Sequence, residues 1–264
     1  MIKGLDNFVT LNEETHTYTD QTGRVYMSVS KFRDRFKKLF DKNIAFQCAG
    51  KGEYAGMTPQ QVIAKWDTYR DERASIGTAL HNALERFEKT TVINNDDENL
   101  KPAILSITSE YRDYYRIYQE QVLYDAEFGI AGTADKLCVT SSHKDAPIDI
   151  CDYKTNAKGV NVKDFDKTGK PIHKYFLHCL SHLLESKYSD YALQLSIYAY
   201  MLEKKTGRKI GSLRIHFIPT DNPLAHYFIP VPYMKHEVIE MFNWHRQNPV
   251  VKLKDPFEEE IELN

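Results

Sequence analysis

Residues 148–155 read IDICDYKT, a short apolar and β-branched stretch interrupted by charge. This pattern predicts a β-strand from Ile148 to Lys154 that is apolar enough to be central in a sheet. Residues two apart on a strand point to the same face, so Asp152 and Lys154 should project together, with Ile148 and Ile150 further back on that face. Buried charges are costly unless they are paired or bind a metal, so this charged pair needs a partner or a function.

A second acid precedes this strand. Asp135 ends the stretch Gly132-Thr-Ala-Asp135, in which small residues let a carboxylate pack closely near a strand end. Two carboxylates can bind a hard divalent cation, and a lysine beside them can orient or help deprotonate a water. Together they are the minimum equipment for metal-assisted hydrolysis of a phosphodiester. The alternative is an exposed acid–lysine pair, which is common by chance. Asp149 lies on the opposite strand face and is expected to be solvated or in contact with a loop.

Length and composition predict one large domain or a domain with elaborations. The chain has 264 residues, of which 42% are hydrophobic and 12% aromatic, so a sizeable core can form. The 35 Lys and Arg residues nearly balance the 37 Asp and Glu residues, for a net charge of -2. Bulk charge therefore does not indicate nucleic-acid binding, and any basic groove must be local.

The four cysteines are scattered without a CxxC spacing, which disfavours a zinc ribbon and favours a reduced cytosolic setting. Cys138 and Cys151 fall in expected strands and are predicted core residues. The N-terminus lacks the apolar region of a signal peptide, and no run of about 18 apolar residues predicts a membrane span. The expectation is a cytoplasmic, globular protein without membrane contact.

The order of helices and strands predicts an α/β or α+β fold, in which helices pack against a sheet. Residues 8–29 are expected to form a β-hairpin, and Thr58-Pro-Gln-Gln61 is a capping box that starts a helix. Gly129 marks the turn of an antiparallel pair, and Gly207 ends a helix. The other expected helices span residues 30–39, 73–89, 102–119, 189–205 and 235–247, and the other expected strands span residues 122–128, 130–139, 213–217 and 227–231. The expected division is residues 1–72, an N-terminal hairpin and helical elaboration; 73–233, the core; and 234–264, a C-terminal helix and acidic tail, all in one compact domain.

Polar side chains interrupt two of the apolar helices. His81 and Glu85 lie one turn apart on the helix expected over residues 73–89, and Gln194 and Tyr198 are spaced likewise on a later helix. Each pair is either a site component or an ordinary polar intrusion into a core helix, and for His81 alone the second interpretation is the more common. His178 and His182 share this spacing and suggest zinc only weakly, because no cysteine or clear third ligand is near.

Taken in order, these motifs resemble the PD-(D/E)xK nuclease superfamily, and most of all its RecB-type exonuclease branch, with features of stand-alone phage or bacterial members. The resemblance covers residues 73–217 and implies a restriction-endonuclease-like core, with a central mixed β-sheet flanked by helices. The motifs are Gly77-Thr78-x-x-His81, Glu127 with Gly132-x-x-Asp135, Asp152-Tyr153-Lys154-Thr155 and Gln194-x-x-x-Tyr198.

The resemblance implies a role for each matching residue. His81 would be a metal ligand from the helix, and Asp135 and Asp152 would be the carboxylate ligands. The main-chain carbonyl of Tyr153 would be a further ligand. Lys154 would position the attacking water and stabilise the developing charge.

Three further residues match the branch, and two departures from it stand out. Glu127 matches an upstream acid, while Gln194 and Tyr198 would support the site or contact the DNA backbone. Asp152 stands where many relatives have Glu, although both bind metals. No cysteine follows Cys179, so no iron–sulfur cluster is expected.

The function that the resemblance implies is a Mg²⁺- or Mn²⁺-dependent DNA exonuclease of recombination, repair or phage DNA processing. Its partners would be single-stranded DNA or DNA ends, and a helicase or a single-strand-binding or annealing protein. The alternatives are a structure- or sequence-specific endonuclease of this superfamily and a non-catalytic nucleic-acid-binding protein. Residues 156–187 hold six lysines and three acids, and they form either a path for a DNA strand or a solvated loop.

Overall fold

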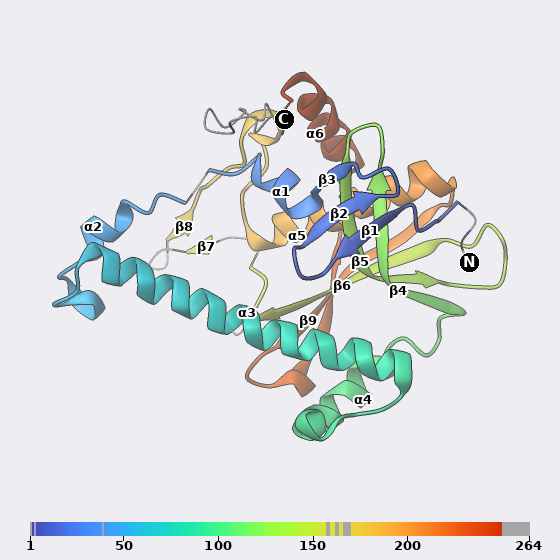
Figure 1. Ribbon diagram of the computed structural model, residues 1–264, viewed down its shortest axis with the longest axis horizontal. Coiled ribbons are helices and arrows are strands. Elements are labelled where there is room, and N and C mark those ends of the chain that lie inside the picture. The colour runs from blue at the N-terminus through green and yellow to red at the C-terminus, as the bar shows by residue number, and fades with distance from the viewer. Residues whose placement is uncertain are drawn as a thin grey trace, which may run out of the picture.

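The strand predicted over residues 148–154 is β6, in the middle of a mixed sheet (Figure 1). The computed structural model describes residues 2, 4–38, 40–156, 159–161, 164, 165 and 170–249. The eight strands of this sheet are β1 (Val9–Asn12), β2 (Thr17–Asp20), β3 (Val25–Ser28), β4 (Arg116–Asp125), β5 (Ile130–Val139), β6 (Ile148–Asn156), β9 (Ile210–Pro219) and β10 (Tyr227–Val231).

The strand order is β1-β2-β3-β5-β6-β9-β10, and β4 pairs with β5 beside this path. The predicted antiparallel pairs are confirmed: β2 with β3, β4 with β5, and β9 with β10. β6 is antiparallel to β5 and parallel to β9. A separate two-stranded pair joins β7 (Asp164–Phe165) to β8 (Pro171–Ile172).

Helices cover both faces of the sheet. On one face, Leu84 and Ile104 pack with Cys138 and Cys151, which are core residues as predicted. On the other face, the helical residues pack against Ile148 and its strand neighbours. The first layer consists of α3 (Pro59–Thr90) and α4 (Lys101–Ser109), and the second of α1 (Val29–Asp34), α5 (Lys187–Thr206) and α6 (Lys235–Gln247). The predicted α/β fold is confirmed, with a central mixed β-sheet flanked by helices.

The prediction of separate helices after Thr58 and over residues 73–89 is wrong, because α3 is one helix of 32 residues. Thr58 and Gln61 form the predicted capping box at its start. The stretch around Arg73 is rich in Arg, Asp and Glu and contains no Pro or Gly that would break a helix. At a rise of 1.5 Å per residue, α3 is about 48 Å long. Figure 1 shows α3 crossing the sheet, with α2 (Ile44–Cys48) near its N-terminal end.

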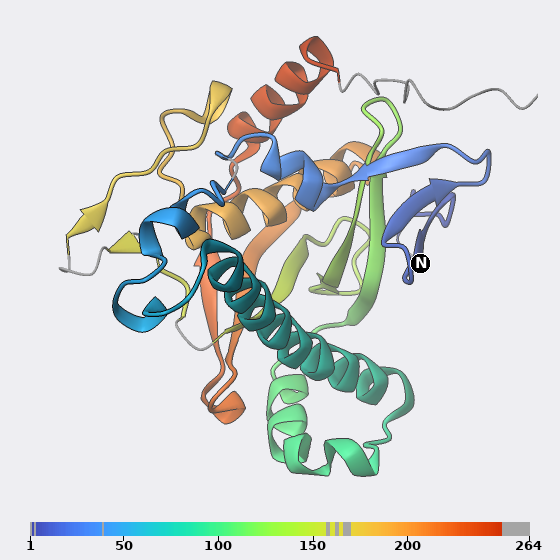
Figure 2. The same ribbon diagram turned by 60° about the vertical axis from the view of Figure 1, so that its left-hand side comes forward.

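The helix predicted over residues 102–119 is also wrong in its second half. α4 ends at Ser109, and β4 begins at Arg116. Aromatic and β-branched residues around Ile117 favour a strand, and pairing with β5 decides the outcome. Figure 2 shows α4 lying below the C-terminal part of α3.

Other boundaries differ by a few residues. α5 begins at Lys187 because Ser186, and not Ser189 or Asp190, is the N-cap; its hydroxyl accepts a hydrogen bond from the Ser189 nitrogen. Its C-cap is Gly207, as predicted, with φ of 67°. Short 3₁₀ turns complete the described elements: Gly52–Tyr54, Asn95–Leu100, His178–Leu180 and Pro223–Ala225. Among the described helices, none has the length and apolar character needed to cross a membrane.

A fork in the sheet positions the candidate site. β4 pairs with β5 along its length, so β3 and β6 share the other edge of β5. β3 pairs there with residues 130–131, and β6 pairs with residues 136–139. On this edge, residues 132–135 have no partner among the described strands. Asp135 lies where β5 and β6 part.

Candidate active site

A pocket of about 540 Å³ opens where β5 and β6 part. It gathers residues from α3, β5, β6 and α5, which are far apart in the sequence. Its lining is Gly77, Thr78, His81, Asp135, Asp152, Tyr153, Lys154, Thr155 and Gln194. Except for Glu127 and Tyr198, the predicted site residues therefore meet in one pocket.

Asp152 and Lys154 share a face of β6, as predicted. Asp152 is 2% exposed, and the Lys154 ammonium group contacts its carboxylate. Burial acts to lower the pKa of Lys154, but Asp152 and Asp135 outweigh it, so the net shift is upward. Lys154 is therefore a cation at neutral pH, suited to orienting a water or an anionic oxygen rather than to removing a proton.

Lys136 pairs with Cys151 at the end of the antiparallel ladder between β5 and β6. Extending this register by one residue places Asp135 opposite Asp152. Oδ2 of Asp135 accepts a hydrogen bond of 2.7 Å from the main-chain nitrogen of Tyr153. Burial, and then the nearby Asp152 carboxylate, raise the pKa of Asp135 to about 6, although His81 and Lys154 act in the opposite direction. Burial and a second carboxylate therefore both disfavour the charge on Asp135.

His81 reaches the pocket from α3. Its Nδ1 lies 4.0 Å from Asp135 Oδ2, and its ring meets the Tyr153 ring edge to face at 5.4 Å. A glycine one turn earlier makes this approach possible, because a Cβ on Gly77 would lie 2.5 Å from Thr155 Oγ1. The motif Gly77-x-x-x-His81 thus combines close helix–sheet packing with a projecting imidazole.

Gln194 and Tyr198 come from α5, with one reaching the pocket and the other supporting it. Gln194 lines the pocket, and its Nε2 donates to the Tyr198 hydroxyl at 3.1 Å. Tyr198 is buried against β5, where a Cβ on Gly132 would lie 2.8 Å from its ring. Gly132 therefore admits the Tyr198 ring, which in turn holds Gln194.

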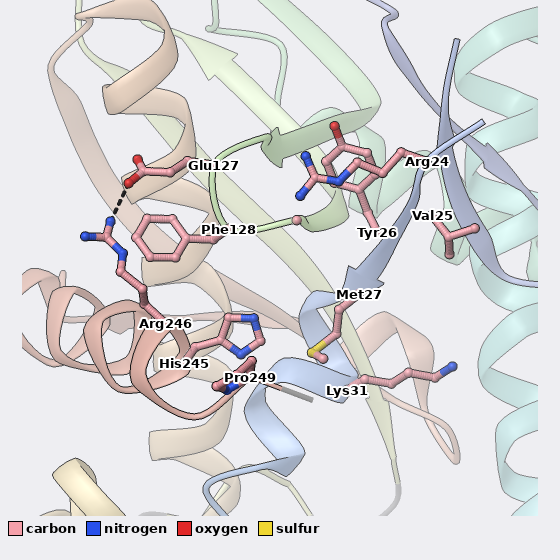
Figure 3. Close-up of a pocket in the computed structure, with 11 residues that line it drawn as sticks. Arg24, Val25, Tyr26, Met27, Lys31, Glu127, Phe128, His245, Arg246 and Pro249 are labelled. Atoms are coloured by element: carbon pink, nitrogen blue, oxygen red, sulfur yellow. Dashed lines mark hydrogen bonds and ion pairs between the residues drawn. The ribbon is translucent and has the colours of Figure 1, made fainter. Parts of the chain in front are cut away.

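The structure does not bring Glu127 to this pocket, so its predicted place in the site is wrong. Glu127 lies in the β4–β5 turn, where it forms ion pairs with Lys204 and Arg246. Figure 3 shows Glu127 joined to Arg246 beside Phe128, in a different pocket of about 500 Å³. The Lys204 contact lowers the pKa of Glu127, as expected for an exposed, paired carboxylate.

The acid of β4 that does approach the site is Glu120, which the sequence reasoning missed. It lies between Gln119 and Gln121, which pair with Lys136 and Ala134, so it stands opposite Asp135. Its φ is 45°, an unusual value for a residue with a side chain. Burial, and then Asp135 and Glu85, raise the pKa of Glu120 to about 8. Its sequence signal is a lone acid in an otherwise uncharged strand from Ile117 to Tyr124.

Asp149 lies on the opposite face of β6 from Asp152, as predicted, and of its two expected environments it has the loop contact, because Tyr114 lies in the loop between α4 and β4. Its Oδ2 accepts from the Tyr114 hydroxyl and its Oδ1 from the Ser212 nitrogen, each at 2.7 Å. A Cβ on Gly211 would lie 2.1 Å from the same Oδ1. Asp149 therefore fastens the start of β9 to β6.

The two histidines spaced for zinc do not converge. His178 stacks on Trp244 with ring centroids 4.3 Å apart, while His182 Nε2 lies 3.7 Å from a Glu237 carboxylate oxygen. In the lysine-bearing segment, Lys174 pairs with Glu185 at 2.6 Å. Lys158, Lys163 and Lys167 lie outside the described residues.

The pocket's donors suit a hard divalent cation. Carboxylate oxygens of Asp135 and Asp152 are preferred ligands of Mg²⁺ and Mn²⁺, and His81 adds an imidazole nitrogen. The mutual effect of the two carboxylates on the pKa of Asp135 is the kind of repulsion that a cation relieves. Within the described ranges, however, no three His, Cys, Asp or Glu side chains are already grouped as a metal site. Binding would require the Lys154–Asp152 contact and the His81–Asp135 spacing to adjust.

The chain is similar in structure to two solved proteins of low sequence identity. One is a crystal structure named "Putative exonuclease" from Eubacterium rectale, with 14% identity, 90% of this chain and 85% of that chain covered, and a TM-score of 0.41. The other is the crystal structure of SSO0001, with 14% identity, 84% and 75% coverage, and a TM-score of 0.33. No protein-family model and no curated protein matches the chain.

Proposed function

We propose that this chain is a nuclease that hydrolyses phosphodiester bonds of DNA with the help of Mg²⁺ or Mn²⁺. The observation that carries the proposal is that Asp135, Asp152 and protonated Lys154 meet in one pocket. His81, on α3, reaches to within 4.0 Å of Asp135 there. Two carboxylates whose charges repel and an ammonium group beside them match the needs of phosphate chemistry better than those of an ordinary polar core.

Each residue has a task that follows from its charge and place. Asp135, Asp152 and His81 would hold the cation, with the Tyr153 carbonyl as a further ligand. When bound, the cation would supply charge neutralisation at the scissile phosphate. Lys154 would orient the attacking water and stabilise the charge that develops on the phosphate oxygens.

The finer proposal is exonucleolytic action on single-stranded DNA or DNA ends. Recombination, repair or phage DNA processing would be its setting, and a helicase or a single-strand-binding or annealing protein its partner. The order of motifs supports this proposal, since His81, Asp135, Asp152, Lys154 and Gln194 follow one another as in the RecB-type branch and meet in one pocket.

The test is digestion of end-labelled single- and double-stranded DNA, with each end labelled in turn, and of circular DNA, in Mg²⁺ and Mn²⁺. The protein should release nucleotides from linear DNA and stop in EDTA, while Asp152→Asn and Lys154→Met should each lose at least about a hundredfold in rate. Glu127→Gln is the matched control, because Glu127 lies outside the pocket.

Three outcomes would contradict this proposal or its finer part. Full activity in Asp152→Asn or Lys154→Met would show that this pocket is not the active site. Cleavage of circular DNA would replace the exonuclease with an endonuclease. Binding of DNA without any cleavage in either cation would favour a non-catalytic DNA-binding protein.

A further inference from the structure

A buried ion pair lies directly behind the candidate site. Lys136, the residue after Asp135, is 1% exposed, and its ammonium group donates a hydrogen bond of 2.5 Å to Glu88 on α3. The rings of Tyr111 and Tyr153 surround it, with centroids 4.6 and 5.3 Å from the Lys136 nitrogen. Neither Lys136 nor Glu88 lines the pocket.

Stability alone is a weak reason for this ion pair. Taking two charges out of water costs free energy that their attraction only partly returns, and apolar side chains of similar size often serve the fold as well. What an ion pair adds over apolar packing is a defined direction and distance between two elements. Here the two elements are α3 and β5.

The place of the pair makes that distance matter. Glu88 lies two helical turns after His81, and Lys136 is the neighbour of Asp135. One turn before His81, Gly77 lets α3 touch Thr155. The helix is therefore fastened to the sheet on both sides of the imidazole, by a close steric contact on one side and by the ion pair on the other.

Tyr153 connects the same groups by a second route. Its hydroxyl donates to Glu88 at 3.4 Å, and its main-chain nitrogen donates to Asp135 at 2.7 Å. Its ring also packs edge to face against His81. A displacement of Glu88 thus acts on both His81 and the strand that holds Asp135.

We infer that Glu88 and Lys136 are positioning residues whose ion pair sets the spacing between His81 and Asp135. Neither residue touches the substrate. The use of that spacing in cation binding and catalysis rests on the proposed function.

The experiment compares the double variant Glu88→Met/Lys136→Met with Arg86→Met/Asp97→Asn. The control removes an ion pair of 2.6 Å that joins the same helix to the 3₁₀ turn Asn95–Leu100 instead of to the sheet. Methionine is close in size to glutamate, lysine and arginine but carries no charge, and asparagine is the neutral isostere of aspartate. The measurements are thermal unfolding, Mn²⁺ binding by calorimetry, kcat and KM on DNA, and the NMR resonances of the His81 imidazole.

The Glu88→Met/Lys136→Met protein should remain folded, shift the His81 resonances, bind Mn²⁺ about tenfold or more weakly and lose a similar factor in kcat, with little change in KM. The control should match the wild type in all four. If the double variant fails to unfold cooperatively, Glu88→Asp replaces it, because it keeps the charge but shortens the side chain by one methylene.

Unchanged His81 resonances in a folded variant would overturn the inference, even if the wild-type protein cleaves no DNA. Shifted resonances together with wild-type Mn²⁺ affinity and kcat would also overturn it, because the spacing would then have no use. Absence of Mn²⁺ binding and cleavage in the wild type would defeat the proposed function instead and leave the His81 readout to decide the positioning role.

Discussion

The main-chain nitrogen of Tyr153 donates a hydrogen bond of 2.7 Å to Oδ2 of Asp135, at the point where β5 and β6 stop pairing. A side chain thus continues the connection between strands after the backbone ladder ends. The same carboxylate has a raised pKa, so the group that joins the strands is also one whose charge the fold tolerates poorly.

Replacing Asp135 by Asn should stabilise the protein at pH 8. The pKa of Asp135 is raised from 3.8 to about 6, so the native state binds this proton more tightly than the unfolded state does. Its contribution to stability is complete below about pH 4 and is lost as pH rises through about 6. Asn keeps an acceptor for the Tyr153 nitrogen without the charge, and the gain at pH 8 should be about 1–3 kcal/mol.

Urea unfolding without divalent cations at pH 4, 6 and 8 measures this difference. The advantage of Asp135→Asn should shrink towards pH 4, where the wild-type carboxyl is also neutral. An Asn variant that is less stable than the wild type at pH 8 would show that the attraction of the Asp135 carboxylate to His81 and Lys154 outweighs its burial and its repulsion by Asp152.

Replacing Glu120 by Gln should reduce the protons released when Mn²⁺ binds at pH 7. With a pKa of about 8, Glu120 is mostly protonated there, and a cation beside Asp135 would lower that pKa and expel the proton. Calorimetry in two buffers of different ionisation enthalpy counts these protons. Glu127→Gln is the control, because the lowered pKa of Glu127 leaves it ionised in both states. Equal proton release in wild type and Glu120→Gln would contradict the assignment.

Introducing a Cβ at position 77 should push α3 away from β6. Alanine favours a helix over glycine by about 1 kcal/mol, but its Cβ would lie 2.5 Å from Thr155 Oγ1. Gly77→Ala is therefore expected to lower nuclease activity about tenfold or more, since small displacements of site residues are costly. The double variant Gly77→Ala/Thr155→Ala removes the clashing oxygen and should recover most of the loss.

The comparison with Thr155→Ala alone separates packing from chemistry. If Thr155→Ala is as inactive as Gly77→Ala, the Thr155 hydroxyl acts in the reaction itself. If the double variant stays as inactive as Gly77→Ala, the clash is not the cause.

Removing Glu127 should leave nuclease activity unchanged. Glu127→Ala loses ion pairs with Lys204 and Arg246, and because these side chains are largely exposed, the free energy of unfolding should change little. Activity on linear DNA and urea unfolding measure both quantities. A loss of more than about tenfold in rate at normal stability would show that Glu127 takes part in the reaction after all.

The contrast between Asp152 and Glu127 shows what the sequence can predict. The common face of Asp152 and Lys154 follows from the two-residue repeat of a strand, which is local, and the structure confirms it. Which acid of β4 stands opposite Asp135 depends on the strand register across a turn, and that register selects Glu120. The φ of 45° at Glu120 is likewise set by its surroundings and leaves no mark in the sequence.

The helix errors have a similar origin. Thr58 and Gln61 predict where α3 begins, because a cap is a local arrangement of a few residues. Its continuity past Arg73 and the change from α4 to β4 near Tyr115 depend on packing against the sheet and on pairing with β5, so local propensity alone does not decide them.

The unbroken course of α3 has a mechanical consequence. Trp66, near the N-terminal end of α3, donates a hydrogen bond of 3.0 Å to the Tyr54 hydroxyl and so ties the helix to the segment before it. The only proline of α3 is Pro59 at its start, so a force applied at Trp66 is transmitted along the helix instead of being absorbed at a hinge. Such a force meets the sheet first where Gly77 contacts Thr155, and His81 lies just beyond that contact, before the ion pair of Glu88 with Lys136.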